Sequence, residues 1–381
     1  MEVKVVIGAN YGDEGKGLVT NFFTTQAKGR TLNVLHNGGC QRGHTVVTNG
    51  KRHVFHCFGS GTLNGAETYY HKNFLVDPIA WTIEVQQLGF SPKLWVDLNC
   101  RIVTPYDIAS NRLKELKRGE KRHGSCGLGI FETITRSKVV PLYVTDLFNE
   151  IELYHKLRQI QQYYQDQNKE DIRFFEQVEL DQFFRSVHLF VEAVETTSNC
   201  IYKEYDTIIF EGGQGLRLDQ DNKEDFPYLT PSSTGSAAIV SDIKLLVRKF
   251  NANVEVCYIT RPYLTRHGAG PLKNECKMSE LSSRIVDITN QPNPWQGTIR
   301  YAPIDLNEFE DYVNWDMYLY STCGLEVKFS LALTQAHLSN NKIFLDNNRM
   351  ADLNDIDLLF NEYYIFTMER IDAKDVETQS L

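Results

Sequence analysis

Short apolar segments alternate with amphipathic ones along the chain. Five runs of apolar and β-branched residues have the length of strands, and each ends near a polar or glycine-rich segment. Leu18, Val19, Phe22 and Phe23 instead fall on one face of a helix. This alternation predicts an α/β fold with a central, largely parallel sheet flanked by helices, and ligands at the carboxyl ends of its strands. The expected strands are 3–7, 32–35, 207–210, 254–259 and 329–333.

Two charged stretches read as solvated helices. Residues 150–198 look helical and highly charged, and residues 111–122 form a basic amphipathic stretch. A chain of 381 residues could hold one large domain or two, but no repeat, low-complexity segment or clear linker divides it. We therefore expect a single domain over residues 1–381, with a helical insertion at about 150–198.

The segment 5–17 predicts a phosphate-binding loop, and with it a P-loop-like nucleotide-binding fold. An apolar strand leads into a glycine-rich turn that carries Asp13, Glu14 and Lys16, and the helical pattern follows. Glycines let backbone N–H groups approach a phosphate, a helix N-terminus favours negative charge, and Lys16 adds a cation. The loop is not a Walker A motif, because Gly17 stands where that motif has the Ser or Thr that holds magnesium. Asp13 is the nearest substitute ligand, and an ordinary strand–turn–helix connection is the alternative.

Residues 36–47 have a similar shape, with an apolar approach, a flexible polar turn and a β-branched exit. His44 stands where the turn joins the following strand. Beside a phosphate loop, a protonated imidazole could neutralise an oxyanion, which makes His44 a candidate general acid. A structural or merely exposed histidine is the alternative.

These two segments together resemble the adenylosuccinate synthetase family. Further matching segments are Phe-Glu-Gly-Gly-Gln-Gly at 210–215, Pro-Tyr-Leu-Thr at 227–230 and Thr-Arg-His-Gly-Ala-Gly-Pro at 265–271, so the resemblance covers most of residues 1–340 in order. Members of the family join the amino group of L-aspartate to C6 of a purine nucleotide and use a nucleoside triphosphate to phosphorylate the purine 6-oxygen. The resemblance implies a C–N bond-forming ligase of purine biosynthesis with small-molecule substrates and Mg²⁺.

The resemblance also implies a role for individual residues. Asp13 would be the base at purine N1 and a metal ligand, His44 the acid over O6 and the γ-phosphate, and the Gly43 carbonyl a second metal ligand. Arg136 would reach across a two-fold interface into the partner's site, which implies a homodimer. The nucleotide- and phosphate-binding set is Gly12, Asp13, Glu14, Gly15, Lys16, Gly17, Gly43, His44, Thr45 and Gln335. The purine monophosphate set is Asp13, Gln41, Ser125, Arg136, Gln214 and Thr230, and the aspartate set is Gly297, Thr298 and Arg300.

The chain departs from the family pattern at the aspartate and ribose position. Where members making adenylosuccinate carry a Thr-Gly followed by four arginines, residues 295–303 read Trp-Gln-Gly-Thr-Ile-Arg-Tyr-Ala-Pro. Arg300 remains and could clamp a carboxylate, while Thr298 occupies the position that meets the ribose 2′-hydroxyl. An arginine there is unnecessary if the substrate is a 2′-deoxynucleotide.

A second departure concerns the phosphoryl donor. The family's Thr-Lys-x-Asp, whose carboxylate reads guanine, is replaced by Thr-Gln-Ala-His at 334–337. Without the carboxylate, the guanine N1–H and 2-amino donors lose their partner. The amide of Gln335 could instead serve adenine, so we expect ATP or dATP as the donor.

These changes resemble the phage branch of the family, the N6-succino-2-amino-2′-deoxyadenylate synthases. That branch condenses dGMP with L-aspartate, using ATP, toward the 2-aminoadenine of bacteriophage DNA. Guanine offers Asp13 the same N1–H as hypoxanthine, and the altered turn 40–42 could bind or make room for a 2-amino group. Ordinary adenylosuccinate synthesis from IMP with GTP is one alternative. A non-catalytic nucleotide-binding relative is another alternative. The residues retained for catalysis and substrate binding argue against it: Asp13, Lys16, His44, Gln214 and Arg300.

Composition narrows the partners. Apolar residues make up 42% of the chain, enough for a large core, and the net charge of −9 argues against broad nucleic-acid binding. Eight cysteines without a C-x-x-C pair suit a reducing cytoplasm, that of the host if the protein is viral. The N-terminus runs straight into a strand without a signal peptide, and no apolar run approaches membrane-spanning length, so we expect no membrane partner.

Overall fold

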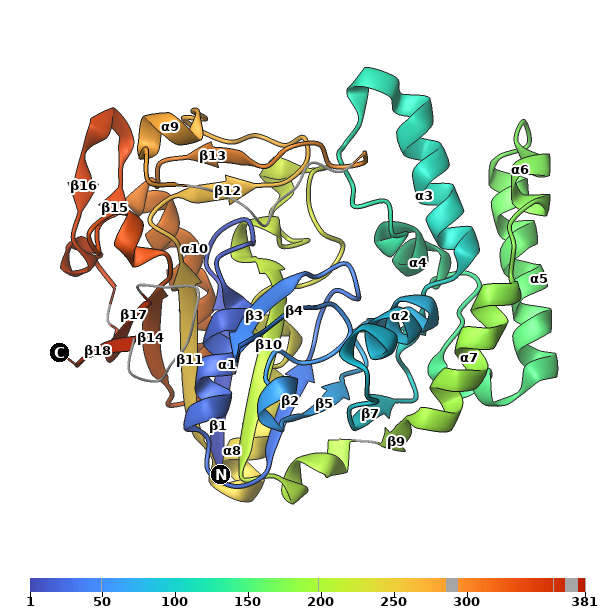
Figure 1. Cartoon of the computed structure of the whole chain (residues 1–381), viewed down its shortest axis with the longest axis horizontal. Coiled ribbons are helices and arrows are strands. Elements are labelled where there is room, and N and C mark those ends of the chain that lie inside the picture. The colour runs from blue at the N-terminus through green and yellow to red at the C-terminus, as the bar shows by residue number, and fades with distance from the viewer. Residues whose placement is uncertain (49, 198, 286–293, 359, 367–375, 381) are drawn as a thin grey trace.

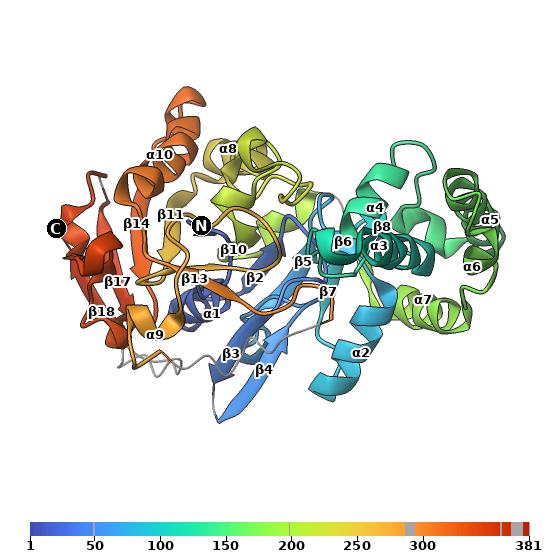
Figure 2. The same ribbon diagram turned by 90° about the horizontal axis from the view of Figure 1, so that it is seen from above.

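The computed structural model describes residues 1–48, 50–197, 199–285, 294–358, 360–366 and 376–380. A ten-stranded sheet runs through the molecule, with helices on both of its faces (Figures 1 and 2). Its strand order is β18 (Val376–Ser380), β17 (Glu362–Phe366), β14 (Lys328–Leu333), β11 (Asn253–Thr260), β1 (Glu2–Gly8), β10 (Thr207–Gly215), β2 (Thr31–Leu35), β5 (Glu67–Tyr70), β7 (Leu94–Asp97) and β9 (Glu195–Thr197). Neighbouring strands are parallel throughout, apart from the antiparallel pair β17–β18.

The helices and the smaller strand pairs surround this sheet. The helices are α1 (Lys16–Gln26), α2 (Pro78–Leu88), α3 (Pro105–Arg118), α4 (Ile130–Arg136), α5 (Glu150–Gln167), α6 (Ile172–Glu176), α7 (Asp181–Ala193), α8 (Val240–Phe250), α9 (Met278–Leu281) and α10 (Leu306–Thr322). The strand pairs are β3 (His44–Thr48) with β4 (Lys51–Phe55), β6 (Leu75–Val76) with β8 (Arg101–Ile102), β12 (Leu264–Arg266) with β13 (Arg300–Ala302), and β15 (Ile343–Phe344) with β16 (Met350–Ala351).

Alternate residues of β1 pack on opposite faces of the sheet. Val5 and Ile7 belong to a buried cluster that includes side chains of α8 and α10, whereas Val6 packs with Val19 and Phe22 of α1. Burial on both faces explains why β1 reads as a continuous apolar run. Because β1 lies between β10 and β11, the loop after β1 meets the segments that follow both neighbours.

The predicted α/β fold is confirmed. The five expected strands are β1, β2, β10, β11 and β14, and the helical pattern after the first loop is α1. Strands β5, β7, β9, β17 and β18 were not predicted. The range 150–198 contains α5, α6 and α7, which lie at one end of the molecule (Figure 1), and also β9, which pairs with β7. The single-domain expectation stays a prediction.

One buried ion pair connects α3, α4 and β8. The Arg136 guanidinium donates to both carboxylate oxygens of Asp107, at 3.1 and 2.8 Å, and to the Ile102 carbonyl at 2.8 Å. The Tyr164 hydroxyl of α5 donates to the same carboxylate at 2.6 Å. Arg136 and Asp107 are both fully buried, so each charge depends on the other for compensation.

We predict that Asp107→Ala lowers the free energy of unfolding by about 3–5 kcal/mol, because it leaves the Arg136 charge buried without its partner. Urea denaturation would measure the change. Lys117→Ala is the matched control. Lys117 lies on the same helix as Asp107, and loss of its exposed ion pair with Asp171 should cost less than about 1 kcal/mol. Equal midpoints for the two variants would contradict the prediction.

Candidate nucleotide-binding site

A cavity of about 1430 Å³ opens where the central strands end. Segments far apart in the sequence contribute to its wall, including residues from 11–18, 41–45, 123–126, 226–233 and 334–335. The cavity thereby collects most of the residues that the sequence patterns select. Its size fits a site for more than one small ligand.

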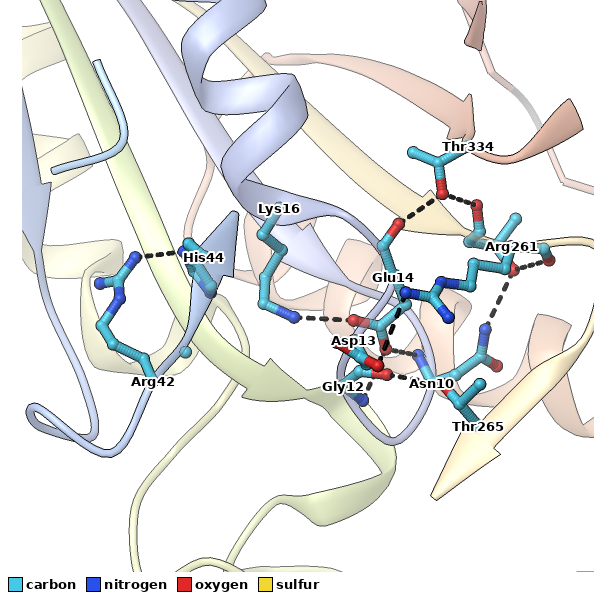
Figure 3. A network of polar contacts seen from close by, with 12 residues as sticks. Asn10, Gly12, Asp13, Glu14, Lys16, Arg42, His44, Arg261, Thr265 and Thr334 are labelled. Carbon is cyan, nitrogen blue, oxygen red and sulfur yellow. Dashed lines mark hydrogen bonds and ion pairs between the residues drawn. The ribbon is translucent and has the colours of Figure 1, made fainter. Parts of the chain in front are cut away.

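The first loop is organised by a buried carboxylate (Figure 3). Glu14 Oε1 accepts the backbone N–H groups of Asn10 and Gly12, at 3.1 and 2.7 Å, and its other oxygen lies 2.7 Å from Lys16 Nζ. The Thr334 hydroxyl donates to the Glu14 carbonyl at 2.5 Å, which ties the loop to the end of β14. Glu14 therefore fixes the loop backbone through the N–H groups of Asn10 and Gly12, and it holds Lys16 at the cavity wall.

Asp13 lies on the cavity side of the same loop. Its backbone has a φ of 68°, a left-handed conformation that turns the loop between two glycines with positive φ, Gly12 and Gly15. The Asp13 carboxylate lies 3.5 Å from the Arg261 guanidinium and 3.9 Å from His267 Nε2. Unlike Glu14, it is partly exposed and lines the cavity, so it can meet a ligand.

His44 is held by a second buried carboxylate. Its Nδ1 lies 2.5 Å from Glu211 Oε1 and 2.6 Å from Arg42 Nη2, and Arg42 also pairs directly with Glu211. The Ser60 backbone N–H and hydroxyl donate to Glu211 at 2.9 and 2.5 Å. With Nδ1 occupied in this cluster, Nε2 is the ring nitrogen that remains for a ligand.

Burial and the neighbouring charges shift the pKa values of His44 and Glu211. Burial, and then the nearby Arg42, lower the pKa of His44 to about 4. Burial alone would raise the pKa of Glu211, but Arg42 and His44 lower it to about 2. At neutral pH the free protein therefore carries a neutral His44, with the positive charge on Arg42. The role of His44 as an acid over a bound phosphate stays a prediction.

The glycine after Lys16 is required by packing. A Cβ on Gly17 would lie 2.8 Å from His44 Cβ, closer than real contacts allow, and a tight 3.2 Å from the His44 backbone. The start of α1 and the start of β3 thus touch through a position that has no side chain.

The structure also brings the predicted purine-site residues to this cavity. Gln41, Ser125, Gln214, Thr230 and Gln335 all line it. Ser125 Oγ accepts a hydrogen bond from Asn111 Nδ2 at 2.9 Å, and Gln214 and Gln335 adopt left-handed backbone conformations with φ of 58° and 56°. The Gln214 Oε1 atom is buried and has no hydrogen-bond donor among the described residues. The roles of these residues stay predictions.

Two predicted assignments meet a different geometry. Arg136 faces the interior of its own chain, where Asp107 occupies its guanidinium; this corrects the expectation that it reaches a partner's site. Arg300 pairs with Glu275, with Nε to Oε1 at 3.0 Å, and donates to the Gly268 and Gly270 carbonyls. The aspartate assignment of Gly297, Thr298 and Arg300 stays a prediction, because none of the three lines the cavity.

Several polar residues of the site were not assigned from the sequence. Glu211 lies within a recognised motif without an expected role, and Arg42 was noted only as part of an altered turn. Arg261, His267 and Arg101 also line the cavity. The available signal was a charged residue directly after, or inside, an apolar strand, which marks the carboxyl edge of a parallel sheet.

The family profile described as adenylosuccinate synthetase matches residues 5–292. The chain belongs to the adenylosuccinate synthetase family. Curated members include those of Mannheimia succiniciproducens, 32% identical over 304 residues, and Aliivibrio fischeri, 29% identical over 288 residues. These alignments cover 75% and 71% of this chain and 68% and 63% of the relatives, so the chain spans about two thirds of their length.

Solved structures of the family have the same fold. The fully ligated adenylosuccinate synthetase of Plasmodium falciparum has a TM-score of 0.66 and 16% identity, over 100% of this chain and 87% of that one. A cyanophage S-2L succinoaminodeoxyadenylate synthetase, bound to dGMP and dATP as an energy donor, has a TM-score of 0.64 and 16% identity, over 99% and 95%. At this identity the likeness shows the fold alone. In the part of the chain that the structure describes, no helix could cross a membrane.

We predict that His44 makes stability fall on acidification. Its folded pKa of about 4 lies below the ordinary value of 6.5, so the unfolded chain takes up the proton first. This contribution is complete above pH 6.5 and is lost as the pH falls toward 4, by up to about 3 kcal/mol. Urea unfolding from pH 7 to 4.5 should show a shallower pH dependence for His44→Gln than for the unchanged protein. Parallel curves would contradict the assignment.

Proposed function

We propose that the protein is a ligase that condenses dGMP with L-aspartate, driven by hydrolysis of ATP or dATP to the diphosphate and phosphate, and yields N6-succino-2-amino-2′-deoxyadenylate. The observation that carries the ligase activity is the meeting, in one cavity, of the Lys16 loop, the Asp13 carboxylate and the His44–Glu211 pair. A protein that only binds nucleotides needs neither a base nor a proton donor at that place.

The chemistry follows from the positions of these groups. Asp13 removes the N1 proton, and the purine O6 attacks the γ-phosphorus, so that the bond to the β-phosphate oxygen breaks and a 6-phosphoryl purine forms. Lys16, Arg42 and His44 line the cavity where charge would develop on the phosphoryl oxygens, and His44 would act through Nε2 when that nitrogen carries a proton. The amine of L-aspartate then attacks C6, loses a proton, and phosphate leaves from C6.

The residues present fit a magnesium ion held largely by substrate. Mg²⁺ usually binds through one or two carboxylates together with phosphate oxygens and water. Among the described residues no cluster of three or more His, Cys, Asp or Glu side chains could hold a metal. The Asp13 carboxylate and the Gly43 carbonyl, both on the cavity wall, would hold the ion, which neutralises charge on the transferring phosphoryl group.

The choice of dGMP and an adenine donor rests on the two sequence departures. Thr298 in place of an arginine suits a deoxyribose. His337 in place of the guanine-binding aspartate removes the acceptor for guanine, and the amide of Gln335 suits adenine. The cyanophage enzyme of the same fold, solved with dGMP and dATP, supports this reading. Ordinary synthesis of adenylosuccinate from IMP is the second candidate, because the curated relatives are adenylosuccinate synthetases. A homodimer belongs to the proposal by resemblance alone, without a role for Arg136.

Matched assays with L-aspartate, magnesium and ATP would test the substrate, with dGMP in one and IMP in the other. We expect phosphate release and a succino-product, identified by mass, with dGMP. Asp13→Asn should lower kcat at least about 100-fold without loss of folding, because the base at N1 is removed. Turnover of IMP alone would favour the second candidate, and full activity of Asp13→Asn would remove the assigned base.

The donor can be tested separately. With dGMP fixed, ATP or dATP should give a kcat/KM at least about 10-fold above that of GTP, because the guanine donors find no carboxylate at 335–337. His337→Asp restores the carboxylate at the position where the family pattern has it and should narrow the ratio. Equal use of ATP and GTP by the unchanged protein would contradict the interpretation of Gln335.

A further inference from the structure

Arg101 approaches the cavity from a direction that the sequence patterns did not indicate. It is the first residue of β8, and it pairs with Leu75 of β6, which in turn forms a bridge with Gly39 of the 38–43 turn. Two strand spacings of about 4.8 Å place the Arg101 backbone roughly 10 Å from Gly39. Figure 2 shows β6 and β8 beside α3 and α4, and Arg101 belongs to the cavity wall.

The charge of Arg101 is not matched within the described residues. Five arginines line the cavity, and four of them have a carboxylate within 4 Å: Arg42 has Glu211, Arg118 has Glu115, Arg261 has Asp13 and Arg266 has Asp225. The fifth, Arg101, has no acidic partner in the parts of the chain that the structure describes. It is partly buried, and burial lowers the pKa of its guanidinium.

The unpaired charge is held in place by a paired one. Arg136, neutralised by Asp107, donates to the Ile102 carbonyl directly after Arg101 and to the Val140 carbonyl. Arg136 is therefore a positioning residue for β8. A fold that fixes the backbone beside an unmatched, half-buried arginine provides an anion site.

The surroundings favour a phosphomonoester over a triphosphate. Ser125, Asn111, Asn73 and Thr135 line the cavity with Arg101 and offer hydroxyl and amide donors. The Lys16 loop touches His44 at one end of the 38–44 segment, whereas Arg101 follows Gly39 at the other end. Lys16 and Arg101 thus lie near opposite ends of that segment within one cavity, which leaves room for the donor's phosphates at one end and a second ligand at the other.

We propose that Arg101 binds the 5′-phosphate of the purine mononucleotide, and that it does so in the site of its own protomer. The inference rests on the proposed function for the identity of the nucleotide, but it requires only that the ligand carry a 5′-phosphate. Arg101 takes over the role that the sequence pattern had given to Arg136.

Calorimetric titration of Arg101→Met with dGMP and with deoxyguanosine tests the contact. The variant keeps most of the aliphatic stem and should bind dGMP about 10- to 100-fold more weakly, with deoxyguanosine unchanged and the KM for ATP unchanged. Arg101→Lys should recover part of the loss, because it restores a charge without the planar fork. Arg349→Met, which makes the same change at an exposed arginine that pairs with Asp346 and does not line the cavity, is the matched control and should leave dGMP binding unchanged.

Two outcomes would overturn the proposal. One is unchanged dGMP affinity in folded Arg101→Met, and the other is an equal loss for dGMP and deoxyguanosine. If dGMP proves not to be the substrate, IMP and inosine replace the two ligands, and the ratio of their affinities still reports on Arg101. Failure of the proposed function and failure of this inference are therefore separable.

The choice of protomer is tested by mixing. If Arg101 serves its own site, mixed dimers of Arg101→Met and His44→Ala contain a defect in every site and recover no activity. Recovery on mixing would show that Arg101 reaches the partner's site and would overturn that part of the proposal. If the unchanged protein is a monomer in solution and binds dGMP, and Arg101→Met binds dGMP more weakly, then Arg101 acts in the site of its own chain. That result would support the proposal.

Discussion

The carboxylate of Glu211 has no access to solvent, and the geometry of the cavity depends on compensating its charge. An uncompensated carboxylate at this depth would cost several kcal/mol, so Arg42, His44 and Ser60 must all remain in position. Glu211 pairs in the sheet with Val6 of β1, which places this requirement beside the first loop. One buried charge thereby joins the central sheet, the 38–44 segment and the segment around Ser60.

The parts of the fold that could be predicted are those whose signal is local. β1 and β11 are long and buried on both faces, so they read as uninterrupted apolar runs, and the glycine-rich loop after β1 can be read from the residue types that a phosphate requires. β5 and β7 have only four residues each, and Glu67 and Asp97 break their apolar pattern. Segments this short become strands because neighbouring strands pair with them. That pairing cannot be read from the residues of the segment itself.

The two arginines whose geometry differs from the expectation have partners distant along the chain. Arg136 and Arg300 carry charges that sequence patterns can only mark as available for substrate. In the fold, Asp107 lies 29 residues before the first and Glu275 lies 25 residues before the second. Arg101 is the opposite case, because its sequence context gives no sign of a binding site. Only the folded structure shows that no carboxylate of the described residues pairs with it. A sequence shows which charged residues are present. Which of them can bind a charged ligand depends on which lack an opposite charge after folding.

The contact between Gly17 and His44 limits how this loop can evolve. A hydroxyl-bearing side chain at position 17 would provide the metal ligand found in many other phosphate-binding loops, but its Cβ would collide with His44. A single substitution therefore cannot convert one kind of loop into the other while the histidine stays in place. Conversion therefore requires positions 17 and 44 to change together, and a library that varies position 17 alone would not contain the other kind of loop.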